Sequence, residues 1–112
     1  MSDDLHFLTI AEAGKRIAKK DLSPVELVEN YVDRIETLNP QLDAFVTPTL
    51  ELAVEQAKSA EAEIAAGNHK GPLHGVPFGL KDIYETKGIL TSGHSKVMED
   101  HIPDQDATTT AK

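Results

Sequence analysis

The sequence contains no cysteine and no tryptophan, and aromatic residues make up only 4% of its 112 positions. Without cysteine, the chain can form neither a disulfide framework nor a zinc site with thiolate ligands. No apolar stretch approaches the ~20 residues that a membrane-spanning helix needs. The first ten residues also lack the basic start and apolar run of a secretory signal. We therefore expect a cytoplasmic protein without membrane contact, whose core is built mainly from aliphatic side chains.

Positive charge is also scarce, because 11 basic residues stand against 19 acidic ones and the net charge is −8. Binding to nucleic acid needs a clustered positive face, so we expect no direct nucleic-acid partner. The basic cluster in the sequence consists of Lys15, Arg16, Lys19 and Lys20. These residues fall near the end of a short predicted helix, where positive charge interacts favourably with the helix dipole. The length is that of a single domain.

The N-terminal part contains two capping signals, in which a hydroxyl residue is followed three positions later by glutamate. They begin at Thr9 and Ser23. The first predicts a helix over residues 10–19, with Ile10, Ala13 and Ile17 facing inward. The second predicts a helix from Pro24 to the Asn39-Pro40 pair, because proline disfavours a helical residue before itself.

Further elements follow these two helices. Residues 44–47 are a short apolar run that predicts a strand, and residues 50–66 predict a third helix with Gly67 as its stop. Residues 83–96 are rich in glycine, serine and threonine and predict a loop. Asp106 then predicts the N-cap of a fourth, short helix.

The chain is organised around the stretch GPLHGVPFGLKD, Gly71–Asp82. Its apolar residues Val76, Phe78 and Leu80 alternate, which predicts a short, mostly buried strand that ends at Lys81. Glycines at 75 and 79 would let other backbone or a ligand approach closely. The predicted fold class is therefore α/β, with N-terminal helices packed on part of a mixed sheet.

Lys81 has two interpretations from spacing alone. A lysine at the end of a strand is usually solvated, but a buried lysine followed by hydroxyl-rich backbone also suits a hydrolase with a lysine base and a serine nucleophile.

Other candidate sites fit less well. The five histidines show no pair at ligand spacing, and Asp100, Asp104 and Asp106 lack the glycine and the closing glutamate of a calcium loop. The glycines before Lys81 lack the Gly-Lys-Ser/Thr sequence of a phosphate-binding loop. We expect no metal and no cofactor.

The segment from Gly71 to Lys112, with SPVELVENYVDRIETLNPQLDAFV before it, closely resembles the start of the amidase signature family. This family includes the A subunit of the tRNA-dependent amidotransferases. The resemblance implies that residues 1–112 are the N-terminal segment of an amidase signature domain, an incomplete portion of its fold. Residues 1–70 would form a helical region, and residues 71–112 would hold the lysine-bearing strand and the Gly/Ser/Thr-rich loop.

The same resemblance implies hydrolysis of a carboxylic amide by a serine nucleophile, a second serine in a cis peptide, and a lysine that falls on Lys81. The family's two serines belong to a signature further downstream, and the chain ends before it. Ser92 and Ser95 lie too near Lys81 and lack that pattern. The chain would therefore carry only the lysine and be inactive alone.

The implied partners are a small-molecule amide substrate and either further copies of the chain or amidotransferase subunits. The isolated chain would expose unpaired strand edges and apolar surface. The alternative is a non-catalytic helical interaction module derived from the same family.

Overall fold

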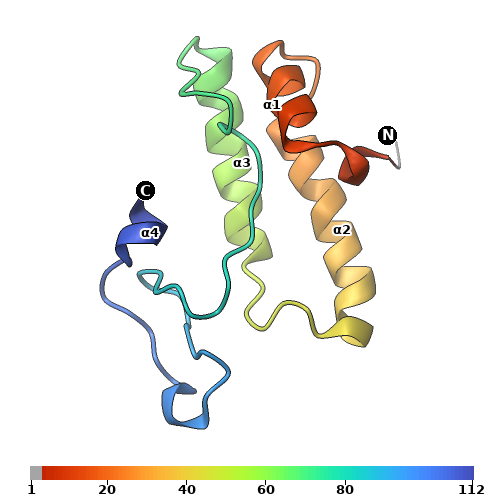
Figure 1. The fold of residues 1–112 in the computed structure, drawn as a ribbon. Coiled ribbons are helices and arrows are strands. Elements are labelled where there is room, and N and C mark those ends of the chain that lie inside the picture. The colour runs from red at the N-terminus through yellow and green to blue at the C-terminus, as the bar shows by residue number, and fades with distance from the viewer. Residues whose placement is uncertain (1–3) are drawn as a thin grey trace. The chain divides into compact units, whose positions relative to one another are not determined.

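The structure is a computed structural model that describes residues 4–112, and it consists of helices joined by irregular segments (Figure 1). The chain divides into two compact units. The first comprises the described residues up to Leu42 together with Thr49–Pro77, and the second comprises Asp43–Pro48 and Phe78–Lys112.

The first unit contains a short 3-10 turn and three α-helices. The turn is η1, Leu5–Phe7, and the helices are α1, Ile10–Ala18, α2, Pro24–Leu42, and α3, Leu50–Ala65. Helices α2 and α3 pack along each other, as Figure 1 shows. All three predicted helices are therefore confirmed.

The start of α1 is a complete capping box. The backbone N–H of Glu12 donates to the Thr9 hydroxyl at 3.2 Å, and the backbone N–H of Thr9 donates to the Glu12 carboxylate at 2.9 Å. At the start of α2, the Ser23 hydroxyl accepts from the backbone N–H groups of Val25 and Glu26. It also donates to Glu61 on α3, so this cap ties two helices together.

The predicted end of α2 at Asn39 is wrong, because the helix continues through Pro40 to Leu42. Proline lacks the backbone N–H that would donate an intrahelical hydrogen bond. The helix ends two residues after Pro40, so the missing bond affects only its last turn. Asp43 then adopts a left-handed conformation with φ 47°. The strand predicted over residues 44–47 is also wrong, since this segment is irregular.

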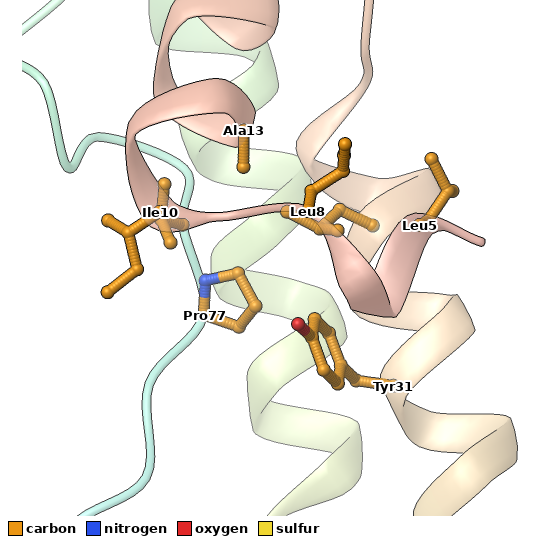
Figure 2. A pocket seen from close by; sticks show the side chains of 8 residues that line it. Leu5, Leu8, Ile10, Ala13, Tyr31 and Pro77 are labelled. Atoms are coloured by element: carbon orange, nitrogen blue, oxygen red, sulfur yellow. The ribbon is translucent and has the colours of Figure 1, made fainter.

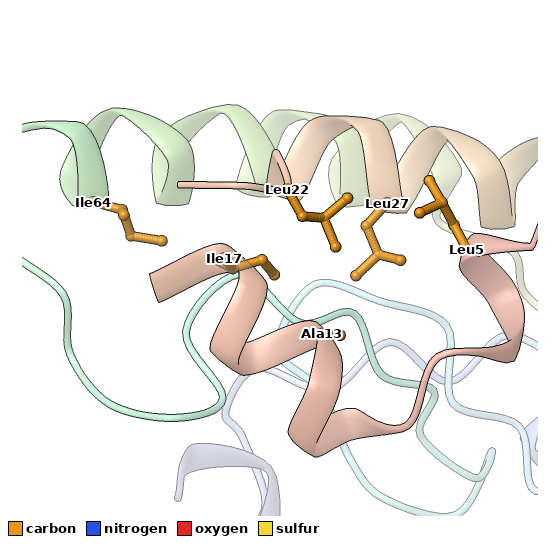
Figure 3. Packing of buried hydrophobic residues seen from close by; sticks show 6 residues of the cluster. All are labelled: Leu5, Ala13, Ile17, Leu22, Leu27 and Ile64. Carbon is orange, nitrogen blue, oxygen red and sulfur yellow. The ribbon is translucent and has the colours of Figure 1, made fainter. Parts of the chain in front are cut away.

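The core of the first unit is a cluster of buried aliphatic side chains that point toward one another (Figure 3). Its members are Leu5, Ala13, Ile17, Leu22, Leu27 and Ile64. The inward positions predicted for Ala13 and Ile17 are confirmed. Ile10 is 63% exposed and does not belong to this core, so that prediction is wrong.

Residues 71–77 of the glycine-rich stretch pack closely on the helices of the first unit. A β-carbon on Gly75, whose φ is +87°, would lie 2.8 Å from the Pro24 side chain, so close approach at this glycine is confirmed. A β-carbon on Gly14 of α1 would collide with the Pro72 carbonyl oxygen. Gly79 differs, because a β-carbon there would make only an ordinary 3.7 Å contact with Phe45.

The predicted mixed sheet, and with it the α/β fold class, is wrong. Residues 4–112 contain no β-strand, and their one recorded bridge is an isolated pair between Thr86 and Ile89. A strand needs a neighbour to accept and donate its backbone hydrogen bonds. The stretch uses turns instead, with His74 N–H bonded to Gly71 O and Val76 N–H bonded to Leu73 O.

The second unit is held by hydrogen bonds between two irregular segments. Gly88 N–H donates to Pro103 O at 3.0 Å, and Thr91 N–H donates to His101 O at 2.9 Å. The unit contains a 3-10 turn, η2, Lys96–Met98, and a short helix, α4, Thr108–Ala111.

The predicted fourth helix is confirmed, but the N-cap predicted for it at Asp106 is wrong. The N-cap position of α4 is Ala107 rather than Asp106. The Asp106 carboxylate instead accepts the backbone N–H of Lys87 at 2.7 Å. Because the Asp106 carboxylate binds this distant backbone amide, it does not cap α4 as the local sequence predicts.

Exposed apolar side chains are frequent in the second unit, as expected. Phe78 is 79% exposed, Val97 91% and Ile102 60%. The accompanying expectation of unpaired strand edges is wrong for residues 4–112, because they form no strand. No helix in this described part of the chain combines the length and apolarity required to cross a bilayer.

Candidate active site

Lys81 lies in a tight turn and not at the end of a buried strand. The carbonyl oxygen of Lys81 accepts the backbone N–H groups of Ile83 at 2.7 Å and Tyr84 at 3.1 Å. The Lys81 side chain is exposed. No hydrogen bond or ion pair to its ammonium is found among residues 4–112. The expected burial of this residue by a strand is therefore wrong.

The next residue, Asp82, is the centre of a hydrogen-bonded cluster. Its carboxylate accepts the backbone N–H of Ser92 at 3.0 Å on Oδ1 and the Ser92 hydroxyl at 2.7 Å on Oδ2. The backbone N–H of His94 donates to the same Oδ2 at 3.3 Å. The backbone is joined as well, since Gly93 N–H donates to the Asp82 carbonyl oxygen at 2.8 Å.

These bonds favour the ionised carboxylate. The hydrogen bond from the Ser92 hydroxyl lowers the pKa of Asp82, and the backbone N–H groups of Ser92 and His94 lower it further, while burial opposes them. A charged acceptor forms shorter and stronger bonds than a neutral one. The cluster is therefore most stable when Asp82 carries its negative charge.

Ser92 and Ser95 do not form a nucleophile arrangement with this cluster. Ser92 is only 7% exposed, its hydroxyl proton is donated to Asp82, and its oxygen accepts the backbone N–H of His94 at 3.1 Å. Ser95 is exposed and precedes η2 without a side-chain capping bond. The geometry gives Ser92 a structural role.

A second polar cluster lies in the first unit, where the glycine-rich stretch begins. Nε2 of His74 lies 3.0 Å from the Glu63 carboxylate, which also pairs with the Lys70 ammonium at 2.7 Å. The backbone N–H of Lys70 donates to Nδ1 of His74 at 3.1 Å. Because Nδ1 accepts this hydrogen bond, the ring hydrogen lies on Nε2, which donates a hydrogen bond to Glu63. The cluster fastens residues 70–74 to α3.

The comparisons with known proteins identify the family. The family model described as Amidase matches residues 26–112, a range that includes both Lys81 and Asp82. The chain belongs to the amidase family. The resemblance stated from the sequence is thereby confirmed.

Several curated relatives of this amidase-family chain are named as the A subunit of glutamyl-tRNA(Gln) amidotransferase. The protein from Carboxydothermus hydrogenoformans is 40% identical over 109 residues, which are 97% of this chain and 22% of the relative. The protein from Azotobacter vinelandii is 45% identical over 104 residues, which are 93% of this chain and 21% of the relative. The chain thus spans about a fifth of the length of the curated relatives it matches.

A small cavity lined by apolar side chains and Tyr31 lies in the first unit, as Figure 2 shows. Its volume is about 50 Å³, and the Tyr31 hydroxyl lies among apolar side chains there. Its lining consists of Leu5, Leu8, Ile10, Ala13, Leu27, Tyr31, Val76 and Pro77. This space is well below the ~300 Å³ at which small-molecule pockets begin. The cavity is therefore a packing defect and no substrate site.

The sequence pointed to Lys81, which lies in the segment that the family model matches, but it did not predict the hydrogen-bonded cluster around Asp82. Residues 83–96 were interpreted only as a loop, although Thr91 and Ser92 within them are buried. The available signal was an aspartate directly after the lysine and a run of small polar residues ten positions later. No local pattern states that these two segments pair. No group of three metal-ligating side chains converges within the described residues.

Proposed function

We propose that the chain is the N-terminal part of an amidase signature hydrolase, which cleaves a carboxylic amide with Lys81 as the general base. The observation that carries the proposal is the family match over residues 26–112, which includes Lys81 and Asp82. The reaction consumes water and gives an acid and ammonia or an amine. In the mechanism that the resemblance implies, Lys81 acts through a serine in a cis peptide to deprotonate a second serine.

A lysine must be neutral to accept a proton. An exposed lysine with a pKa of about 10.4 is neutral for less than about 0.1% of the time at pH 7. Burial without a carboxylate partner lowers the pKa of a lysine. The Lys81 side chain is exposed among the described residues, so other protein or substrate must cover it before it can act.

The same reasoning supports the proposal that these 112 residues are inactive alone. The glycine- and serine-rich signature that would supply the two serines is not found in the sequence. The hydroxyl of Ser92 is committed to Asp82, so it does not replace the missing nucleophile.

The relatives' names indicate the kind of partner. Both relatives are named as one subunit of an amidotransferase, and a subunit works within an assembly. We propose other amidotransferase subunits, together with a small-molecule amide, as partners of the complete protein. The cytoplasm is the compartment that we propose for it.

A second function is a non-catalytic interaction module. It is favoured by the first unit, whose helices form their own buried core, and by the ammonium of Lys81, which has no partner among the described residues. Such a module would not depend on Lys81.

The experiment is a chimera in which this chain replaces the matching N-terminal region of the Azotobacter vinelandii relative. Ammonia release from glutamine, acetamide and benzamide is measured for the chimera, for Lys81→Ala, and for the control Lys96→Ala at another exposed lysine. Loss of a general base lowers the rate by about 10²–10⁴-fold. We expect that loss for Lys81→Ala only. Unchanged ammonia release by a folded Lys81→Ala chimera would contradict the base role and favour the interaction module.

A further inference from the structure

Asp82 is fixed from both its side chain and its backbone to one short segment. Ser92 supplies two donors to the carboxylate, His94 supplies a third, and Gly93 N–H reaches the Asp82 carbonyl oxygen. Gly93 and His94 both have φ 57°, so this segment turns sharply and aims successive N–H groups at one residue. Four hydrogen bonds onto one residue leave it little freedom.

These hydrogen bonds to Asp82 also set the direction in which the neighbouring Lys81 side chain leaves the backbone. The Asp82 side chain is half-buried and directed toward Ser92, whereas the Lys81 side chain is exposed. No contact to the Lys81 ammonium is found in the described part of the chain, so nothing there holds its outer end. The direction in which the lysine leaves the backbone is therefore set by the backbone of residues 81 and 82.

The carboxylate cannot be replaced by an amide without a cost. Oδ2 accepts from both the Ser92 hydroxyl and the His94 N–H, and an amide NH₂ at that place would face the His94 N–H as a second donor. Turning the amide over would place the same NH₂ against the Ser92 N–H on the other side. Either orientation leaves a donor facing a donor. We call the four hydrogen bonds from Ser92, Gly93 and His94 to Asp82 the anchor. Each orientation of the amide loses part of it.

We propose that Asp82 is a positioning residue for Lys81, whose carboxylate is fastened by Ser92 and His94 and aims the lysine side chain toward the reacting groups. This inference rests on the proposed function, because it assigns Lys81 a reaction to serve. Asp82 itself touches no reacting atom. The Ser92 hydroxyl belongs to the same device, since it contributes the shortest of the bonds to the carboxylate at 2.7 Å.

The test uses the chimera with Asp82→Asn, Ser92→Ala and the control Asp104→Asn. Asp104 is an exposed aspartate of the same unit without a bond to Ser92 or His94. The values of kcat and KM and the pH profile of kcat are measured for each variant. A misplacement of about 1 Å can lower a rate by about 10²-fold. We expect kcat to fall toward that extent for Asp82→Asn and less for Ser92→Ala, with KM unchanged and the acid limb of the profile displaced.

A merely structural role would give a different result. Partial unfolding reduces the amount of active protein, so kcat falls while the shape of the pH profile stays that of the parent. Amide hydrogen exchange at Ser92, Gly93 and His94, measured on the same chimeras, reports whether the anchor has opened. Ser92→Ala keeps the negative charge of Asp82 and removes only the hydroxyl that donates to it. This variant therefore provides the readout if Asp82→Asn does not fold.

The outcomes distinguish failure of the positioning role of Asp82 from failure of the base role of Lys81. If Lys81→Ala keeps full activity, the proposed base role fails and the positioning role fails with it. If Lys81→Ala is inactive but Asp82→Asn and Ser92→Ala keep the parent's kcat and pH profile, only the positioning role is overturned. A parallel loss in Asp104→Asn would also overturn it, because the effect would then not depend on the anchor.

Discussion

The carbonyl oxygen of Pro72 occupies the space in which a β-carbon of Gly14 would lie. The backbone at Pro72 can therefore lie against α1 only because this helix has no side chain at position 14. Gly14 is itself buried, although glycine is an unfavourable residue inside a helix. Glycine is needed at this position, despite its unfavourable helix propensity, because the backbone at Pro72 approaches α1 there.

We predict that Gly14→Ala destabilises the first unit. The added methyl group forces either α1 or the backbone at Pro72 to move, and overpacking of this kind costs about 1–3 kcal/mol. Urea denaturation followed by circular dichroism measures the change. The matched control is Gly79→Ala, because a β-carbon there makes an ordinary 3.7 Å contact. Equal midpoints for Gly14→Ala and the parent would contradict the predicted clash.

We predict that Thr9→Ala shortens or weakens α1. The substitution removes the hydroxyl that accepts the backbone N–H of Glu12, and loss of an N-cap costs about 0.5–2 kcal/mol. The backbone and hydroxyl bonds from Thr9 lower the pKa of Glu12, so this pKa should rise in the variant. NMR titration of the Glu12 carboxyl measures it. Thr9→Ser keeps the hydroxyl and should preserve both the pKa and the stability.

These two sites show which parts of the fold the sequence could predict. Thr9 and Glu12 are three residues apart, so their capping box follows from local spacing, as does the glycine stop after α3. Gly14 and Pro72 meet across a long sequence separation, and no periodicity links them. The alternation of Val76, Phe78 and Leu80 predicted a strand, but alternation supplies no partner, and the stretch forms turns. The Asp82 cluster was missed because its donors lie in a separate loop.

We predict that Glu63 makes stability depend on pH. The hydrogen bond with Lys70 is the main cause that lowers the pKa of Glu63 in the folded chain, and His74 adds to it. A carboxyl group with a lowered folded pKa stabilises the fold above its unfolded pKa, and this stabilisation is lost as pH falls through the folded value. Glu63→Gln should therefore lower the thermal midpoint near neutral pH and have less effect in acid.

The measurement is a series of thermal melts from about pH 7 to about pH 3, which covers the range in which carboxyl groups titrate. Glu55→Gln is the control, because Glu55 is an exposed residue of the same helix. A difference between parent and Glu63→Gln that stays constant over the whole range would show that the Glu63 charge does not stabilise the fold.

We predict that the 112-residue chain by itself releases no ammonia from glutamine, acetamide or benzamide. Lys81 is exposed and the Ser92 hydroxyl is bound to Asp82, so no base and nucleophile pair is assembled. Ammonia is measured by a coupled assay, with the chimera as positive control. Turnover by the chain that Lys81→Ala abolishes would prove this prediction wrong.

We predict that the isolated chain self-associates through the apolar side chains of its second unit. Phe78 is 79% exposed and Val97 91%, and large exposed apolar surfaces mark sites of association. The double variant Phe78→Ser with Val97→Ser should reduce the average mass in sedimentation velocity. Thr108→Ser with Thr109→Ser is the control at two exposed positions of α4. A parent chain that stays monomeric over a wide concentration range would show that these side chains do not drive association.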